Sequence, residues 1–331
     1  MTAAAILGVS GLAPDAWERG FLRDADPFGF ILFARNVESP RQLRRLTGAL
    51  RDAVGRDAPV LVDQEGGRVQ RLRPPHWRDW LPALDQMGRA SDPLRAQWVR
   101  NRLIAHELRQ AGMDVNCAPL ADLVEPETHP ILRNRLYGSE VVPVIAAARA
   151  CADGLMAGGV LPVLKHVPGY GRAVVDGHEA LPRVSVRREA LEARDFAPFR
   201  ALRDLPMAMT AHVVLEALDP DRPATTSPEA IRVIREEIGF DGLLMTDDIG
   251  MAALSGPLRD RAAASVAAGV DLALQCSGAR ADMAAAVEGA GPMTPRAQAR
   301  AARALALRRA PAPCDPDALA EELADLLAAS G

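Results

Sequence analysis

The strongest constraint on the fold is a recurring pattern in which short apolar runs alternate with segments of helical periodicity. Eight such runs occur, each followed by a polar turn, at residues 4–8, 29–34, 59–64, 114–119, 161–166, 207–212, 242–247 and 270–275. The stretches between them include the helical segments 40–54, 92–112 and 227–239. The last of these begins with Ser-Pro-Glu, the chemistry expected at a helix start. The pattern predicts an α/β fold.

Strands that are apolar on both faces need helices on both faces, so a parallel sheet covered by helices is expected. Eight such units that close on themselves form a (β/α)8 TIM-type barrel, which we predict for residues 1–309. An open doubly wound sheet is the alternative, but the nearest glycine signature, at 169–171, lacks its third glycine. Residues 310–331 are interpreted as a Pro-rich linker and a terminal amphipathic helix, packed on the barrel or on a partner.

Charge and cysteine usage limit the partners and the compartment. The 39 Lys and Arg residues and 43 Asp and Glu residues give a formal net charge of −4, so neither nucleic acid nor an anionic membrane is an expected partner. No apolar run reaches membrane-spanning length. The four cysteines, at 117, 151, 276 and 314, are too widely spaced for a CxxC pair and too few for a disulfide framework. This usage favours a reducing, cytoplasmic compartment.

Lysine occurs once in the chain, as Lys165, and every other basic residue is arginine. Coding bias alone explains an excess of arginine. The same bias acted on all basic positions, however, so Lys165 is the position where a compact ammonium group is most plausibly required. We therefore predict a functional role for Lys165.

Polar residues at the carboxyl ends of barrel strands face a common mouth, where barrel enzymes carry their chemistry. The residues in such positions are Arg35, Asn36, Asp63, Glu65, Asn116, Lys165, His166, His212, Asp247 and Asp248. Asp247 and Asp248 end one strand, and successive side chains of a strand point to opposite sides. One carboxylate is expected in the mouth and the other toward the helices, and spacing alone does not say which.

A long loop follows the fifth apolar run and contains Asp176 and His178, two residues apart. An aspartate beside a histidine orients the imidazole and favours its protonated form, which suits a general acid. A solvated loop histidine that lies near an acid by chance is an equally simple interpretation. His212 follows a Met-rich strand and fits a hydrogen-bonded core histidine as well as a site residue.

The segment from Asp63 to Arg71 places a carboxylate, two glycines and two guanidinium groups close together, which suits a ligand rich in hydroxyl groups. A surface turn with ordinary salt bridges is the alternative interpretation. No His-rich tract or HExxH motif occurs, and His76, His106 and His129 have no carboxylate or cysteine at metal-ligand spacing. No metal or other cofactor is predicted.

Several longer motifs follow one another along the barrel: GFILFARN (29–36), VDQEGGRVQRL (62–72), NCAPLAD (116–122), NRLYG (134–138), KHVPGYG (165–171), DGH (176–178), MTAHV (209–213) and GFDGLLMTDDIGM (239–251). In sequence and order they resemble the family 3 glycoside hydrolases, and specifically the single-domain bacterial β-N-acetylglucosaminidases of peptidoglycan recycling. The resemblance covers nearly the whole barrel.

The resemblance implies a retaining double displacement, with Asp247 as nucleophile and His178, oriented by Asp176, as acid and then base. It also implies a set of residues that hold the terminal N-acetylglucosamine: Asp63, Arg71, Arg135, Lys165 and His166. His212, Asn116 and Tyr170 form a second tier of candidates. The chain departs from the family at two positions, because Tyr170 stands where histidine is usual and Gly177 where serine or threonine is usual.

The function that the resemblance implies is exo-acting hydrolysis of terminal N-acetylglucosamine from muropeptides, where it is β-1,4-linked to anhydro-N-acetylmuramic acid. A phosphorylase on the same scaffold is one alternative, because a histidine donor does not repel incoming phosphate. A catalytically silent muropeptide-binding protein is another, and a Schiff-base lyase built on Lys165 is a third. The sequence does not indicate an oligomeric state.

Overall fold

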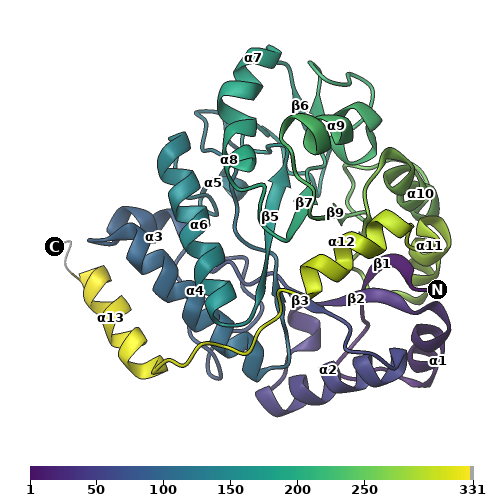
Figure 1. Ribbon diagram of the computed structural model, residues 1–331, viewed down its shortest axis with the longest axis horizontal. Helices are drawn as coiled ribbons and strands as arrows, with labels where there is room; N and C mark the ends of the chain where they lie inside the picture. The colour runs from purple at the N-terminus through teal and green to yellow at the C-terminus, as the bar shows by residue number, and fades with distance from the viewer. Residues whose placement is uncertain (329–331) are drawn as a thin grey trace.

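The computed structural model describes residues 1–328 and shows a closed barrel of eight parallel strands surrounded by helices (Figure 1). Around the barrel the strands follow the order β1, β10, β9, β7, β5, β4, β3, β2. Their bounds are β1 Ala3–Gly8, β2 Pro27–Leu32, β3 Val60–Val62, β4 Val115–Asn116, β5 Leu161–Val167, β7 Met207–Thr210, β9 Leu243–Asp248 and β10 Leu272–Gln275. The predicted barrel is therefore confirmed, and each of the eight apolar runs coincides with one strand.

Two further strands, β6 (Arg183–Val184) and β8 (Val214–Leu215), pair in parallel outside the barrel. The sequence pattern did not predict this small sheet, because a two-residue strand carries no detectable alternation. It connects the end of the long loop after β5 to the chain that leaves β7. The loop thus returns to the barrel at a defined place before the next helix begins.

The helices cover the outside of the barrel, as expected for strands that are buried on both faces. Their bounds are α1 Ala16–Ala25, α2 Pro40–Val54, α3 Ala83–Arg89, α4 Pro93–Gln110, α5 Pro130–Arg133, α6 Val141–Ala157, α7 Arg188–Ala190, α8 Phe196–Ala201, α9 Pro228–Arg232, α10 Leu258–Ala268, α11 Arg280–Ala290, α12 Pro295–Leu305 and α13 Pro316–Ala328. Short 3₁₀ turns lie at η1 Ala34–Asn36 and η3 Ala224–Thr226, and π-helical turns at η2 Leu191–Asp195 and η4 Val233–Glu237.

Local chemistry explains where the predicted helices start. Ser39 accepts a hydrogen bond from the Gln42 amide at the start of α2, and Ser227 accepts one from Ala230 at the start of α9. The helix expected at 227–239 is split, because α9 continues into the π-helical turn η4. All seven residues of β5 are buried, so the polar groups at its end lie in a closed environment.

The C-terminal segment packs on the same chain. Helix α13 lies along α4 (Figure 1), with Leu323 buried in the contact and Arg95 paired with Glu322 at 2.6 Å. The Ser91 amide donates to the Leu326 carbonyl at 2.9 Å. The predicted terminal helix is present as far as it is described, and residues 329–331 lie outside the described part. No helix in residues 1–328 has the length and apolarity needed to cross a bilayer.

Candidate active site

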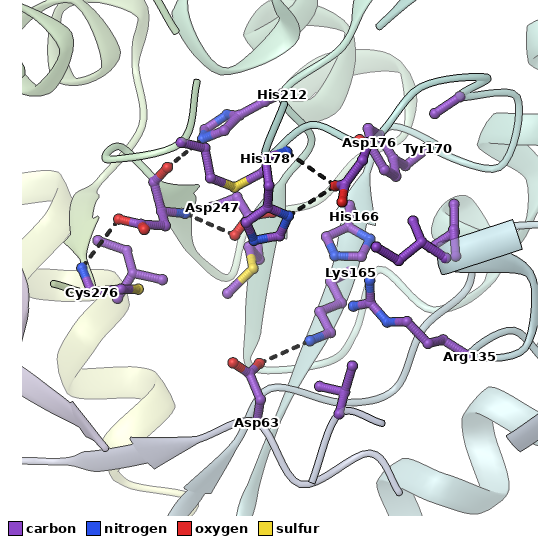
Figure 2. Close-up of a pocket in the computed structure, with 18 of the residues that line it drawn as sticks. Asp63, Arg135, Lys165, His166, Tyr170, Asp176, His178, His212, Asp247 and Cys276 are labelled. Carbon is purple, nitrogen blue, oxygen red and sulfur yellow. Dashed lines mark hydrogen bonds and ion pairs between the residues drawn. The ribbon is translucent and has the colours of Figure 1, made fainter. Parts of the chain in front are cut away.

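A cavity of about 230 Å³ opens at the carboxyl ends of the barrel strands (Figure 2). Among its lining residues are Asp63, Arg71, Arg135, Lys165, His166, Tyr170, Asp176, His178, His212 and Asp247. The structure therefore brings together the residues that the resemblance implies for the site, except Asn116. Arg35, Asn36 and Glu65, which strand-end position placed at the mouth, are not among the lining residues. The lining residues named above come from the ends of β3, β5, β7 and β9 and from the loops around them, which is where a barrel of parallel strands places its chemistry.

A network of buried charges forms the floor of the cavity. The Lys165 ammonium lies 3.0 Å from Asp63 Oδ1 and 2.6 Å from Glu65 Oε1. Arg135 donates two hydrogen bonds of 2.8 Å to the carboxylate of Glu65. Arg71 lies 3.2 Å from Asp63 Oδ2. Glu65 thus bridges the lysine and the arginine, a role that the sequence analysis did not assign to it.

These contacts keep the network ionised. Burial raises the pKa of Glu65, but Arg135 and Lys165 more than offset it and bring the pKa to about 2. Burial and the neighbouring cations act on Asp63 in the same way, and its pKa is well below the usual range. Burial lowers the pKa of Lys165, yet the two carboxylates outweigh burial and raise it above its ordinary value. A protonated lysine is not a nucleophile, which argues against the Schiff-base lyase.

His166 is held by an aspartate that the sequence analysis did not single out. Asp122 Oδ2 lies 2.7 Å from His166 Nδ1 and accepts the His166 amide at 3.1 Å. The other oxygen of Asp122 accepts the Tyr170 amide at 2.7 Å. Because an ionised carboxylate only accepts, Nδ1 carries a proton and Nε2 remains for a ligand. Asp122 is the last residue of the NCAPLAD motif, and this motif was the sequence feature from which Asp122 could have been identified as a site residue.

Asp247 is the penultimate residue of β9 and lines the cavity, and its Oδ1 accepts the Asp248 amide at 2.8 Å. Burial raises the pKa of Asp247, but His166 and His212 more than offset it and hold the pKa below its usual value. His212 is buried, bonded to Thr225 Oγ1 at 2.7 Å and to the Asp248 carbonyl at 2.9 Å. Burial lowers the pKa of His212 below its ordinary value, although the nearby charge of Asp247 opposes the shift.

Asp248, the last residue of β9, is also among the residues that line the cavity. Its Oδ1 accepts the amides of Gly250 at 3.0 Å and Cys276 at 3.1 Å. These bonds fasten the turn after β9 to the end of β10. The two neighbouring carboxylates therefore have different partners, and that of Asp248 is held by two backbone amides.

Across the cavity, Asp176 and His178 form a dyad on the loop after β5 (Figure 2). Asp176 Oδ1 lies 2.9 Å from His178 Nδ1 and accepts the His178 amide at 3.0 Å. Burial raises the pKa of Asp176, but its hydrogen bonds to His178 more than offset it and lower the pKa. The His178 side chain is 67% exposed, so its ring is accessible to a leaving group.

Some polar residues expected at the mouth have other roles. Asn116 lies below the cavity and exchanges two hydrogen bonds with the backbone of Gln64, at 3.0 and 3.1 Å. Arg35 donates to the carbonyls of Val9 and Cys276, which joins the ends of β1 and β10. In residues 1–328 no group of three His, Cys, Asp or Glu residues is arranged to hold a metal ion.

Comparison with known proteins gives a consistent result. The model named Glycosyl hydrolase family 3 N terminal domain matches residues 7–307. A curated protein named Beta-hexosaminidase from Alkalilimnicola ehrlichii is 39% identical over 280 residues, which covers 82% of this chain and 80% of the relative.

Solved structures agree with the curated relatives. The crystal structure of native NagZ from Neisseria gonorrhoeae superposes with a TM-score of 0.84 at 28% identity, and the match covers 100% of this chain and 98% of that one. The same protein in complex with N-trifluoroacetyl-D-glucosamine gives a TM-score of 0.83 at 28% identity, covering 99% and 96%.

Proposed function

The chain belongs to glycosyl hydrolase family 3, and from this membership we propose that it is an exo-acting, retaining β-N-acetylglucosaminidase. The hexosaminidase activity is supported by the names of its relatives and by the amino sugar bound to the Neisseria protein. The proposed substrate is a muropeptide whose terminal N-acetylglucosamine is β-1,4-linked to anhydro-N-acetylmuramic acid, degraded in the cytoplasm during peptidoglycan recycling. No cofactor takes part in the proposed reaction.

In the first step, an Asp247 oxygen attacks the anomeric carbon while the bond to the leaving oxygen breaks. His178 donates a proton to that oxygen, and Asp176 stabilises the imidazolium before transfer. In the second step, water attacks the anomeric carbon of the glycosyl-Asp247 ester. His178 takes the proton from this water, and Asp247 leaves as a carboxylate. The lowered pKa of Asp247 supports the role, because a nucleophile must be ionised.

The charged network is proposed to hold the terminal sugar. Asp63 presents ionised oxygens and Lys165 N–H donors, which suit ring hydroxyl groups. Arg71, Arg135 and His166 line the same cavity. Because every charged group of the network already has a partner of opposite charge within it, a neutral sugar replaces no ion pair when it binds. This explains how a cavity with so many charged residues can bind the uncharged terminal sugar of the substrate.

The observation that carries the proposal is a single cavity with an ionised strand-end carboxylate opposite an exposed, aspartate-bound imidazole. We expect Asp247→Asn to lower kcat/KM for 4-nitrophenyl N-acetyl-β-D-glucosaminide by at least about 10³-fold, because the nucleophile is lost. Asp52→Asn, an exposed change in α2, is the control. A slow 5-fluoro glycosyl substrate should leave an adduct on Asp247 by mass spectrometry. Equal activity of Asp247→Asn and the control contradicts the proposal.

A phosphorylase reaction at the same site is the second candidate. Two residues at the cavity favour it. The imidazole of His178 on the leaving-group side carries no negative charge that would repel an incoming anion, and the guanidinium of Arg68 can attract one. Assays with and without phosphate decide between the two reactions. A phosphate-dependent rate with N-acetylglucosamine 1-phosphate as product establishes the phosphorylase, and a phosphate-independent rate with free sugar establishes the hydrolase.

A further inference from the structure

The Gly177 peptide is held on both sides at the centre of the dyad loop. Its amide donates to the Tyr170 hydroxyl oxygen at 3.1 Å, and its carbonyl accepts the Ala253 amide at 3.1 Å. Ala253 follows β9, the strand that carries Asp247. Gly177 separates Asp176 from His178, so whatever holds this peptide also holds the dyad. Figure 2 shows Tyr170 beside Asp176 at the edge of the cavity.

The hydroxyl of Tyr170 also occupies the space where a side chain at position 177 would lie. A Cβ atom added to Gly177 would lie 2.7 Å from Tyr170 Oη and 2.9 Å from Met251 Cε. The next tyrosine atom, Cζ, is 3.8 Å away, an ordinary van der Waals distance. On the tyrosine side the oxygen alone therefore excludes a side chain. The two positions that depart from the family motifs are in direct contact.

Tyr170 is fixed from the sugar-binding side of the cavity. Its amide donates to Asp122, the same carboxylate that holds His166. Its ring lies 5.5 Å from the His166 ring, measured between centroids. One residue thus connects the proposed sugar-binding histidine to the peptide within the dyad. This connection matters because two other residues of the loop are largely exposed, Val174 at 51% and the His178 side chain at 67%.

We propose that Tyr170 is the positioning residue of the dyad loop, with Gly177 as its required partner. The hydroxyl holds the Gly177 amide, and the missing side chain lets the two approach. This sets His178 over Asp247 before substrate binds, so less ordering of the loop is left to the bound state. The inference rests on the proposed function for its catalytic consequence, and on geometry alone for the position of the loop.

The position of the loop is tested without activity. We expect Tyr170→Phe to increase the hydrogen-exchange rate of the peptide containing Gly177 by at least tenfold, because its amide loses its acceptor. Tyr137→Phe is the matched control, since Tyr137 is the only other tyrosine, is buried and does not line the cavity. The control should leave exchange in this loop unchanged. Equal exchange in wild type and Tyr170→Phe overturns the proposal.

The catalytic consequence is tested by combining two changes. With Tyr170 present, Gly177→Ala should lower kcat/KM at least tenfold, because the methyl group displaces the hydroxyl. In the Tyr170→Phe background the same change should cost at most threefold, because the colliding oxygen is gone. Additive effects of the two substitutions overturn the direct contact as the cause.

Comparing two substrates distinguishes a positioning role of Tyr170 from a general disturbance of the active site. We expect Tyr170→Phe to reduce kcat/KM for a substrate with a sugar leaving group more than for the 4-nitrophenyl glycoside, since only the sugar needs a proton donor. The inhibition constant for free N-acetylglucosamine should be unchanged. Equal losses with both substrates, or a weakened inhibition constant, overturn the positioning role. A wild-type protein without hydrolase activity refutes the proposed function, whereas the exchange experiment still decides whether Tyr170 holds the loop.

Discussion

At the residue scale, Lys165 shows why one position kept a lysine in a chain that otherwise uses arginine. Its side chain is 3% exposed and its single nitrogen contacts two carboxylates, those of Asp63 and Glu65. A tetrahedral ammonium suits this compact place, whereas a planar guanidinium needs more room and a different arrangement of acceptors. Composition alone identified the position. It did not identify Glu65 as the second partner.

The buried position of Glu65 leads to a prediction about acid stability. The pKa of Glu65 is about 2 in the folded protein, and its ordinary value of 4.5 applies to the unfolded chain. Between these two pH values the unfolded chain therefore binds more protons than the folded protein. The stabilisation is fully present above pH 4.5 and is lost as the pH falls toward 2. We expect Glu65→Gln to lower the free energy of unfolding at pH 7 by about 3 kcal/mol, because two buried cations lose their charged partner.

The measurement is urea denaturation at several pH values between 7 and 3. Wild type should lose stability as the pH falls below 4.5, and Glu65→Gln should lose less over the same range. Glu38→Gln is the control, because Glu38 is exposed and should follow the wild-type curve. A variant curve parallel to that of wild type would show that Glu65 does not cause the acid sensitivity.

At the scale of elements, close approach between segments decides which glycines the barrel needs. Gly8 ends β1, and a Cβ there would lie 2.5 Å from the Cys276 carbonyl oxygen after β10. The barrel closes between these two strands, so the glycine is a condition of closure. A glycine inside a helix with free space around it serves no such purpose and weakens the helix.

Two helical glycines provide a matched test. A Cβ at Gly48 in α2 would meet no atom within 4 Å, so Gly48→Ala should stabilise the protein by about 0.5 to 1 kcal/mol. A Cβ at Gly289 in α11 would collide with the Arg259 carbonyl in α10, so Gly289→Ala should destabilise it by about 1 to 3 kcal/mol. Thermal unfolding of both variants measures the effects. Shifts of the same sign would contradict the account.

At the scale of the whole molecule, the barrel and the C-terminal helix have separate roles. Helix α13 contributes no residue to the cavity and packs on α4 at the outside of the barrel (Figure 1). The linker before it is also attached, since the Ala312 amide donates to the Ala157 carbonyl at 2.9 Å. The segment therefore adds packing to one side of the barrel without reaching the chemistry.

This separation predicts stability loss without loss of activity. Leu323→Ala removes the buried contact of α13 and should lower the free energy of unfolding by about 2 kcal/mol, the low end of the range for Leu→Ala. The kcat for the 4-nitrophenyl glycoside should stay at the wild-type value. Denaturation and steady-state kinetics provide the two measurements, with Glu321→Ala, an exposed change in the same helix, as the control. A large fall in kcat would show that α13 influences the site.

The barrel, its eight strands and most of the cavity could be predicted from the amino-acid sequence. These features depend on local properties, because alternation of apolar runs with helical segments repeats along the chain and parallel strands bring their carboxyl ends together. Lys165, the pair Asp247 and Asp248, and the pair Asp176 and His178 were candidates on the same ground, because each lies near the end of a strand or in a long loop after one. The choice of Asp247 over Asp248 came from the family resemblance.

The partners of these residues became visible only in the folded molecule. Asp122 lies 44 positions from His166, and Glu65 lies 70 positions from Arg135, so no local pattern relates them. Tyr170 and Gly177 are close in sequence, yet only the folded loop brings hydroxyl and amide together. Burial and the neighbouring charges set the pKa of a side chain and decide which groups it contacts. The segments that bury the side chain and carry those charges meet only after the barrel has closed.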